Sequence, residues 1–176
     1  MTQVADRVAF SPAAGETRTL RRSLLAGFLT GQVSGLIMAA VVMAVFTLFL
    51  GKGPLFPVQV IGSFVTGDAA LHGFHAPSFI AGLLLHQLGP SLGWGLAFGL
   101  LVGLFGLRGG KLAAAAIAVG LVSQVVDLNL IGSRAFVYFH GHDIWAENVP
   151  AFWSWAAHLV FGLGLLLYPV IERKLD

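Results

Sequence analysis

Four long apolar stretches alternate with short segments that carry most of the charges along this chain. The first runs from Leu24 to Leu50 without an Asp, Glu, Lys or Arg. At about 1.5 Å per residue, a helix of that length exceeds the roughly 30 Å of a bilayer's hydrocarbon core. The pattern therefore predicts an all-α, polytopic membrane protein with four transmembrane helices, over residues 24–50, 78–107, 112–131 and 152–171.

The links between these helices differ in length and character. A short turn follows the second helix, whereas two longer loops, 51–77 and 132–151, follow the first and the third. The longer loop after the first helix contains an apolar segment, 54–66, that is too short to span a membrane, so we expect it to be interfacial or re-entrant. Residues 1–23 form a polar N-terminal tail, and residues 24–176 form one transmembrane domain.

Basic residues gather on one side of this arrangement, which gives its orientation. Eight of the ten Lys and Arg residues lie in the N-terminal tail, in the short turn or at the C-terminus. Only Lys52 and Arg134 lie in the two longer loops. The positive-inside rule then predicts that both termini are cytoplasmic and that both longer loops face outward. The first helix is too long for a signal-peptide core, so we expect it to be retained in a bacterial inner membrane.

Composition excludes several classes of protein. The chain is 57% hydrophobic and only 10% charged, against roughly 25% charged residues in a soluble domain. It contains no cysteine, which excludes disulfides, thiolate zinc sites and iron–sulfur clusters. A net charge of +2 does not indicate a nucleic-acid surface. Because no nucleotide-binding loop, serine elbow or His-Glu-x-x-His motif occurs, we do not expect an enzyme.

The two longer loops and the helices after them resemble each other. The first half contains Ile61-Gly62-Ser63, then histidines, a Pro-x-Phe and His86. The second half contains Ile131-Gly132-Ser133, then histidines, a Pro-x-Phe and His158. This order predicts two duplicated helical hairpins that share one orientation.

Glycines recur every four residues on the first two helices and form smooth stripes for close helix packing. The six glycines are Gly27, Gly31, Gly35, Gly95, Gly99 and Gly103. Pro90 lies within the second helix and is expected to kink it just below His86. Two such stripes exceed what one small bundle needs, so the pattern favours contact with other subunits or self-association.

His86 and His158 lie at similar depths, because each is six to eight residues below the outer end of its helix. Two imidazoles at matching depth are what a bis-histidine haem b requires. Asp127 lies at a similar level on the third helix, where an ionised group needs a partner. We expect that partner to be His86, His158 or Arg134. The alternatives are that the histidines are structural, or that Asp127 and the histidines form a proton path.

The outer loops carry the other four histidines, which suggest a second site. His140 and His142 precede Asp143 and Glu147, and His72 and His75 lie in the matching loop. Imidazole and carboxylate ligands suit copper or zinc. The alternative is that these histidines are ordinary solvated loop residues.

Several motifs resemble those of a family of small four-span bacterial inner-membrane proteins of the domain-of-unknown-function type. They are Pro57-Val-Gln-Val-Ile-Gly62, Gly67-Asp-Ala69, His86 in a glycine-rich helix, and Trp155-Ala-Ala-His158-Leu-Val-Phe-Gly162. The resemblance covers most of the chain after residue 24. It implies four spans with a buried histidine on the second and fourth, and it implies no activity or ligand.

These patterns together favour an accessory subunit that packs against a larger membrane complex, such as a respiratory or photosynthetic electron-transfer complex. A haem b or copper protein that uses the outer-side histidines is the first alternative. A small proton-coupled transporter is the second.

Overall fold

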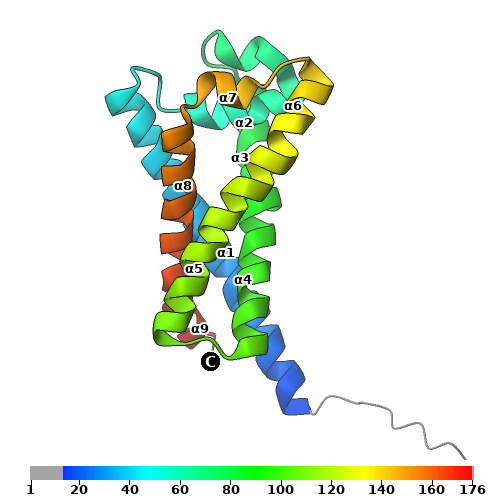
Figure 1. Ribbon diagram of the computed structural model, residues 1–176, viewed down its shortest axis with the longest axis vertical. Coiled ribbons are helices and arrows are strands. Elements are labelled where there is room, and N and C mark those ends of the chain that lie inside the picture. Colours follow the sequence, from blue (N-terminus) through cyan, green and yellow to red (C-terminus); the bar gives the residue numbers. More distant parts are fainter. Residues whose placement is uncertain (1–13, 176) are drawn as a thin grey trace, which may run out of the picture.

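The computed structural model describes residues 14–175, and within this range it is helical with no strands. Four of its helical segments are long and apolar enough to cross a membrane. Span 1 is Thr19–Phe49, span 2 is Ala76–Phe105, span 3 is Gly109–His140 and span 4 is Ala151–Arg173. Figure 1 shows them as a bundle whose long axes run in roughly the same direction. The prediction of an all-α polytopic protein is confirmed.

Most spans are built from more than one helical element. Span 1 lies within α1 (Ala14–Phe49), and span 2 joins α3 (Ala76–His86), the π-helical turn η2 (Gln87–Ser91) and α4 (Leu92–Phe105). Span 3 joins α5 (Gly109–Ser123), the π-helical segment η3 (Gln124–Gly132) and α6 (Ser133–His140). Span 4 joins α8 (Ala151–Gly164), the 3₁₀ turn η4 (Leu165–Leu167) and α9 (Tyr168–Arg173).

The two longer loops fold into a helical cap at one end of the bundle. The cap consists of α2 (Phe56–Thr66), the 3₁₀ turn η1 (Gly67–Leu71) and α7 (Ile144–Asn148). In Figure 1 it lies at the top, beside the upper end of α6, while the start of α1 and the C-terminus lie at the bottom. The segment predicted as interfacial or re-entrant is therefore a short helix that covers the spans.

Glycines let spans 1 and 2 approach each other closely. A Cβ built at Gly31 would lie 2.6 Å from the Cα of Gly95, and one built at Gly27 would lie 2.6 Å from the Cα of Gly99. Only glycine fits at such distances, so these positions pack backbone against backbone. These four glycines form a backbone contact between spans 1 and 2.

The two stripes face each other, so they do not serve as an argument for contact with other subunits. Gly35 faces Gln87 and Ser91 of span 2, and Gly103 faces Leu20 and Ser23 of span 1. Both stripes are thus used inside the chain, against each other.

Spans 3 and 4 pack through a second glycine contact that the sequence analysis missed. A Cβ built at Gly120 would lie 2.8 Å from the Cα of Gly162, and one built at Gly162 would lie 2.7 Å from the carbonyl oxygen of Ala116. Spans 1 and 4 also pack along each other, with Gly164 against the side chain of Ser34.

Two apolar clusters lie at different levels of the molecule. The lower cluster joins all four spans, and its buried members include Phe98, Val102, Ala116, Phe161 and Tyr168. The upper cluster joins the cap to spans 1 and 3, and its buried members are Phe46, Phe56, Val60, Phe136, Ile144 and Val149. The site described below lies between them.

Two predicted boundaries differ from the structure. The helix of span 1 begins at Ala14, inside the segment predicted as a tail, of which residues 1–13 lie outside the described part of the chain. Span 3 was predicted to end at Ile131 but continues to His140, where Gly141 with φ +81° ends the helix. Arg134 marks the end of the apolar stretch, and a helix can continue past that point into the interface.

Candidate functional site

A cavity of about 290 Å³ lies inside the bundle, on the cap side of its middle. Its walls include Met38 of span 1, His86 of span 2, Asp127 of span 3 and His158 of span 4. The remaining lining residues are mostly apolar and aromatic: Ile61, Phe64, Leu85, Gly89, Pro90, Ser91, Trp94, Ser123, Leu128, Ile131, Gly132, Phe136, Trp145 and Phe161. We name this the histidine cavity. It brings together the three ionisable residues that the sequence analysis selected within the spans.

His86 is fixed by an amide network between spans 1 and 2. Gln87 donates from Nε2 to the carbonyl oxygen of Gln32 at 3.3 Å, and Gln32 donates from its own Nε2 to the carbonyl oxygen of Gln87 at 2.9 Å. This pairing turns the Oε1 of Gln87 toward His86, whose Nδ1 lies 3.1 Å away. An amide oxygen only accepts, so the Nδ1 of His86 carries the proton of this bond.

His158 is fixed in the same way by its own helix. Its Nδ1 lies 3.0 Å from the carbonyl oxygen of Ser154, one turn earlier, and its side chain is only 7% exposed. The carbonyl oxygen only accepts, so the Nδ1 of His158 is also the protonated nitrogen. Ser154 is itself tied into the wall, since its hydroxyl donates to Gln124 Oε1 at 2.9 Å and accepts from Trp145 Nε1 at 3.3 Å.

The two histidines therefore offer the same chemistry to one cavity. In a neutral imidazole whose Nδ1 is protonated, Nε2 carries an exposed lone pair. Such a nitrogen accepts a hydrogen bond or binds a metal, and an Nδ1–H bonded to an oxygen is the usual arrangement behind a ligating histidine. The cavity thus presents two acceptor nitrogens on different spans.

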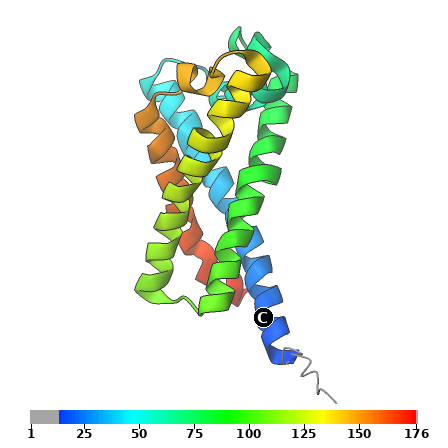
Figure 2. The same ribbon diagram turned by 45° about the vertical axis from the view of Figure 1, so that its right-hand side comes forward.

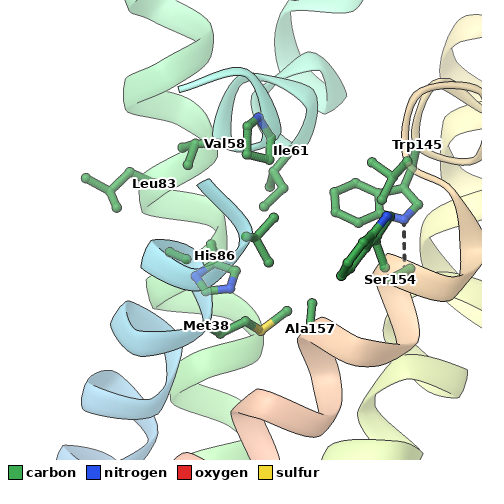
Figure 3. Close-up of a pocket in the computed structure, with 13 residues that line it drawn as sticks. Met38, Val58, Ile61, Leu83, His86, Trp145, Ser154 and Ala157 are labelled. Atoms are coloured by element: carbon green, nitrogen blue, oxygen red, sulfur yellow. Dashed lines mark hydrogen bonds between the residues drawn. The ribbon is translucent and has the colours of Figure 1, made fainter. Parts of the chain in front are cut away.

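A second, smaller cavity adjoins the histidine cavity. It holds about 30 Å³, which is the space of one water molecule. Figure 3 shows Met38 of α1, the ring of His86 and Ala157 of α8 around it, with Trp145 bonded to Ser154 on its far side. Because His86 lines both cavities, its ring lies at their junction.

Asp127 has a partner that the sequence analysis did not foresee. Trp94 donates its indole N–H to both carboxylate oxygens, at 2.9 Å and 2.8 Å. We predicted His86, His158 or Arg134, and none of these bonds to Asp127 in the described part of the chain. Trp94 and Asp127 lie on spans 2 and 3, so this contact bridges two helices on one side of the cavity.

Both π-helical segments of the described chain lie in the cavity wall. η2 contributes Gly89, Pro90 and Ser91, and η3 contributes Asp127 and Leu128 among others. Pro90 has no N–H and its ring would crowd the preceding turn, which a wider turn accommodates. π-Helical turns occur often at functional sites. The predicted disturbance at Pro90 is thus a π turn beside the site.

The four loop histidines do not form one cluster. His75 Nδ1 lies 2.6 Å from the hydroxyl of Ser78, and His140 Nε2 donates to the carbonyl oxygen of Phe64 at 3.0 Å. Among residues 14–175, no group of three or more His, Asp or Glu side chains is placed to hold a metal ion. The geometry therefore gives no support to the predicted copper or zinc site at His72, His75, His140 and His142.

His142 instead links the two halves of the cap. Its Nδ1 lies 2.8 Å from Glu147 Oε2, and its Nε2 lies 3.3 Å from Asp68 Oδ1 of η1. The hydrogen bond that His142 donates to Glu147, together with the negative charges of Glu147 and Asp68, raises the pKa of His142 above its usual value. This contact is an ion pair between the two longer loops when the imidazole is protonated.

The size of the histidine cavity limits what it can hold. Small-molecule sites span roughly 300–1,000 Å³, and the cavity lies at the low end of that range. A porphyrin macrocycle is larger than the ligands of such small sites. The cavity as it stands fits a smaller organic molecule better than it fits haem b.

Comparison of the chain with protein-family models, with curated proteins and with solved structures found no match. The resemblance noted from the motifs around His86 and His158 therefore stays a prediction. What the site does has to be argued from its geometry.

Proposed function

We propose that this protein is a membrane-embedded binding protein that holds a small, largely apolar molecule in the histidine cavity. The proposal depends on the observation that two imidazoles in one cavity have the same tautomer, with the proton on Nδ1. His86 and His158 come from different spans, line one cavity and each engage Nδ1 with an oxygen acceptor. Two inward lone pairs in an apolar cavity suit a ligand that brings hydrogen-bond donors to an otherwise apolar body.

Binding of 1-naphthol tests this proposal, because it is a small two-ring molecule with one hydroxyl donor. 1-Methoxynaphthalene has the same rings and no donor. We expect saturable quenching of tryptophan fluorescence by 1-naphthol, since Trp94 and Trp145 line the cavity. The methoxy compound should bind at least about tenfold more weakly, which corresponds to the roughly 1.4 kcal/mol of one hydrogen bond.

Variants locate the binding. At least one of His86→Leu and His158→Leu should weaken binding of 1-naphthol at least about tenfold, because its single hydroxyl donates to one imidazole, and His72→Leu, which lines neither cavity, is the matched control. Equal binding of the two naphthalenes to the unmodified protein, or quenching that never saturates, would contradict the proposal. The comparison of the two compounds needs no variant, so it remains decisive if a substituted chain fails to fold.

We further propose that the protein lies in a bacterial inner membrane with both termini cytoplasmic and the cap outside. The basic residues support this, since Arg108, Arg173 and Lys174 lie at the end opposite the cap. The proposal of a duplicated hairpin is supported by the two glycine contacts, one between spans 1 and 2 and the other between spans 3 and 4.

Three functional hypotheses from the sequence analysis have weaker support than the binding function proposed above. The accessory-subunit hypothesis loses its glycine argument, because the stripes pack on each other. The haem b hypothesis keeps the histidine pair but would require the cavity to widen. The proton-coupled transporter hypothesis keeps Asp127 in the cavity wall, where both of its oxygens bond to Trp94.

A further inference from the structure

The histidine cavity is closed toward both ends of the bundle. On the cap side lies the upper apolar cluster, with Phe46, Val60 and Ile144 all 0% exposed. On the other side lies the lower cluster, with Phe98, Ala116 and Tyr168 also 0% exposed. An apolar layer of this kind admits no continuous file of water, because water there would lack hydrogen-bond partners. A ligand that enters along the bundle axis would have to displace one of these layers.

Three of the four seams between neighbouring spans hold close contacts along part of their length. Spans 1 and 2 meet at Gly27, Gly31, Gly95 and Gly99, and spans 3 and 4 meet at Gly120 and Gly162. Spans 1 and 4 pack along α1 and α8. The fourth seam lies between spans 2 and 3, where α4 and α5 contact each other less than the helices of the other three seams do. Figure 2 shows the two spans, in green and yellow-green, separating above that turn.

The histidine cavity reaches this fourth seam. Gly89 of η2 and Ile131 of η3 both line the cavity and are both exposed, Ile131 by 59%. Leu88 and Leu130, beside them in the chain, are also exposed, by 65% and 47%. In a spanning helix such apolar side chains face lipid. The mouth of the cavity is therefore rimmed by two π-helical segments and opens toward the hydrocarbon of the membrane.

We propose that the ligand is a lipid-dissolved molecule with a hydroxylated ring as its head, and that it enters sideways between spans 2 and 3. The ring lies between His86 and His158, and an apolar tail leaves through the mouth between Gly89 and Ile131. This inference rests on the proposed binding function and adds the class of ligand and its route.

The chemistry of the walls matches such a molecule from head to tail. Deep in the cavity, His86 and His158 supply acceptor nitrogens for two ring hydroxyls. Nearer the mouth, Leu85, Leu128 and Ile131 supply apolar contacts for a tail. A ligand from water would have no use for an apolar mouth, whereas a molecule already dissolved in lipid reaches it by lateral diffusion.

A single cysteine reports the route, since the natural chain has none. Ser123 is 1% exposed and lines the cavity, so Ser123→Cys places a thiol there with little change in size. In lipid vesicles, N-phenylmaleimide, which dissolves in the membrane, should label it at least tenfold faster than a sulfonated maleimide that stays in water. Ser34→Cys is the control, because Ser34 is 0% exposed and lines neither cavity, and it should remain unlabelled by both reagents.

A matched pair of substitutions on one helical face tests the mouth. A Cβ at Gly89 or at Gly93 would meet nothing within 4 Å, so each site has room for a larger side chain. Gly89 lines the cavity and Gly93, about one turn further along, does not. In the Ser123→Cys background, Gly89→Trp should slow labelling by N-phenylmaleimide at least tenfold, and Gly93→Trp should leave the rate unchanged.

Decylubiquinol and decylubiquinone test the ligand class, because they share one carbon frame and differ in the two hydroxyl donors. Decylubiquinol should protect Ser123→Cys from labelling at least tenfold more effectively than decylubiquinone. The same head group without its decyl tail should protect less than decylubiquinol does.

Each unexpected result has a definite meaning. Faster labelling by the sulfonated maleimide, or equal labelling with Gly89→Trp and Gly93→Trp, would overturn the lateral route. Equal protection by quinol and quinone would overturn the ligand class. If 1-naphthol binds as described above while these tests fail, the binding function stands and this inference falls. If 1-naphthol does not bind, the proposed function itself has failed.

Discussion

Trp94 and Asp127 form a hydrogen-bonded contact between spans 2 and 3. In this contact, a partly buried carboxylate accepts from a neutral donor. The single indole N–H is shared by both carboxylate oxygens, so no other side chain replaces it if it is lost. A carboxylate in this position without a donor is costly, because lipid supplies none.

Trp94→Phe should therefore destabilise the protein by about 1–3 kcal/mol, the usual cost of leaving a buried polar group unpaired. Equilibrium unfolding in mixed detergent micelles measures this loss. Trp155→Phe, at a tryptophan that is 40% exposed, is the matched control and should cost less. Equal losses in the two variants would show that removal of the indole ring, and not the bond to Asp127, causes the effect.

His142 gives the cap a dependence on pH. Its folded-state pKa is raised by Glu147 and Asp68, so the ion pair contributes stability that is fully present below the unfolded pKa of about 6.5. That contribution is lost as the pH rises through the raised folded-state pKa. The cap should therefore resist limited proteolysis better at pH 6 than at pH 9.

His142→Gln should remove this difference between the two pH values, and His72→Gln should preserve it. A cap in the His142→Gln variant that still becomes more sensitive at pH 9 would mean that another group sets the pH dependence. Both variants are cleaved by the same protease at each pH, so the comparison between them cancels the protease's own pH profile.

At the residue scale, the sequence indicated which side chains matter better than it indicated their partners. Equal depth on two helices was enough to place His86 and His158 together, because helical rise is regular. Trp94 was missed because it lies within an apolar stretch, and nothing in the sequence marks its indole as the partner of Asp127. The bond between Trp94 and Asp127 depends on how spans 2 and 3 face each other, and a single sequence does not contain that rotation.

At the scale of helices, spans 1 and 2 are held together by glycines. The space around a glycine differs sharply between positions of α4. A Cβ at Gly95 would lie 2.7 Å from the carbonyl oxygen of Gly27 and 2.8 Å from the Cα of Gly31. A Cβ at Gly93, on the same helix, would meet nothing within 4 Å.

The same substitution at these two positions should have opposite effects on the free energy of unfolding. Gly95→Ala should destabilise by about 1–3 kcal/mol, because the helices are forced apart. Gly93→Ala should stabilise by up to about 1 kcal/mol, because alanine favours a helix more than glycine does. Unfolding in mixed micelles measures both. A Gly95→Ala protein as stable as the parent would contradict the close packing of spans 1 and 2.

The boundaries of the helices show what a hydrophobicity pattern predicts and what it does not. Four spans follow from length and apolar content, and the structure confirms them. The π-helical segment η3 has no proline or other marker, and it continues a helix that the pattern ended at Ile131. Charge marks the end of the hydrocarbon layer and not the end of the helix, so the extension to His140 could not be predicted.

In the whole molecule, three seams of the bundle hold close helix contacts, and the fourth, between spans 2 and 3, holds fewer. The glycine contacts make two close pairs of spans, and α1 and α8 join those pairs along one edge. The opposite edge separates above the turn between spans 2 and 3, and the histidine cavity forms in the space that this leaves. The cavity in which we propose binding is thus a consequence of how unevenly the four seams are packed.

Nitrogen NMR of the purified protein, labelled with ¹⁵N only at histidine, tests most directly whether two acceptor nitrogens face the cavity. Loss of one signal in His86→Gln and of another in His158→Gln assigns the two rings. At neutral pH both should carry their proton on Nδ1 and none on Nε2, and 1-naphthol, with its one hydroxyl donor, should shift the Nε2 signal of at least one ring. A proton on Nε2 of either ring, or Nε2 signals that 1-naphthol leaves unchanged, would contradict the site proposed here.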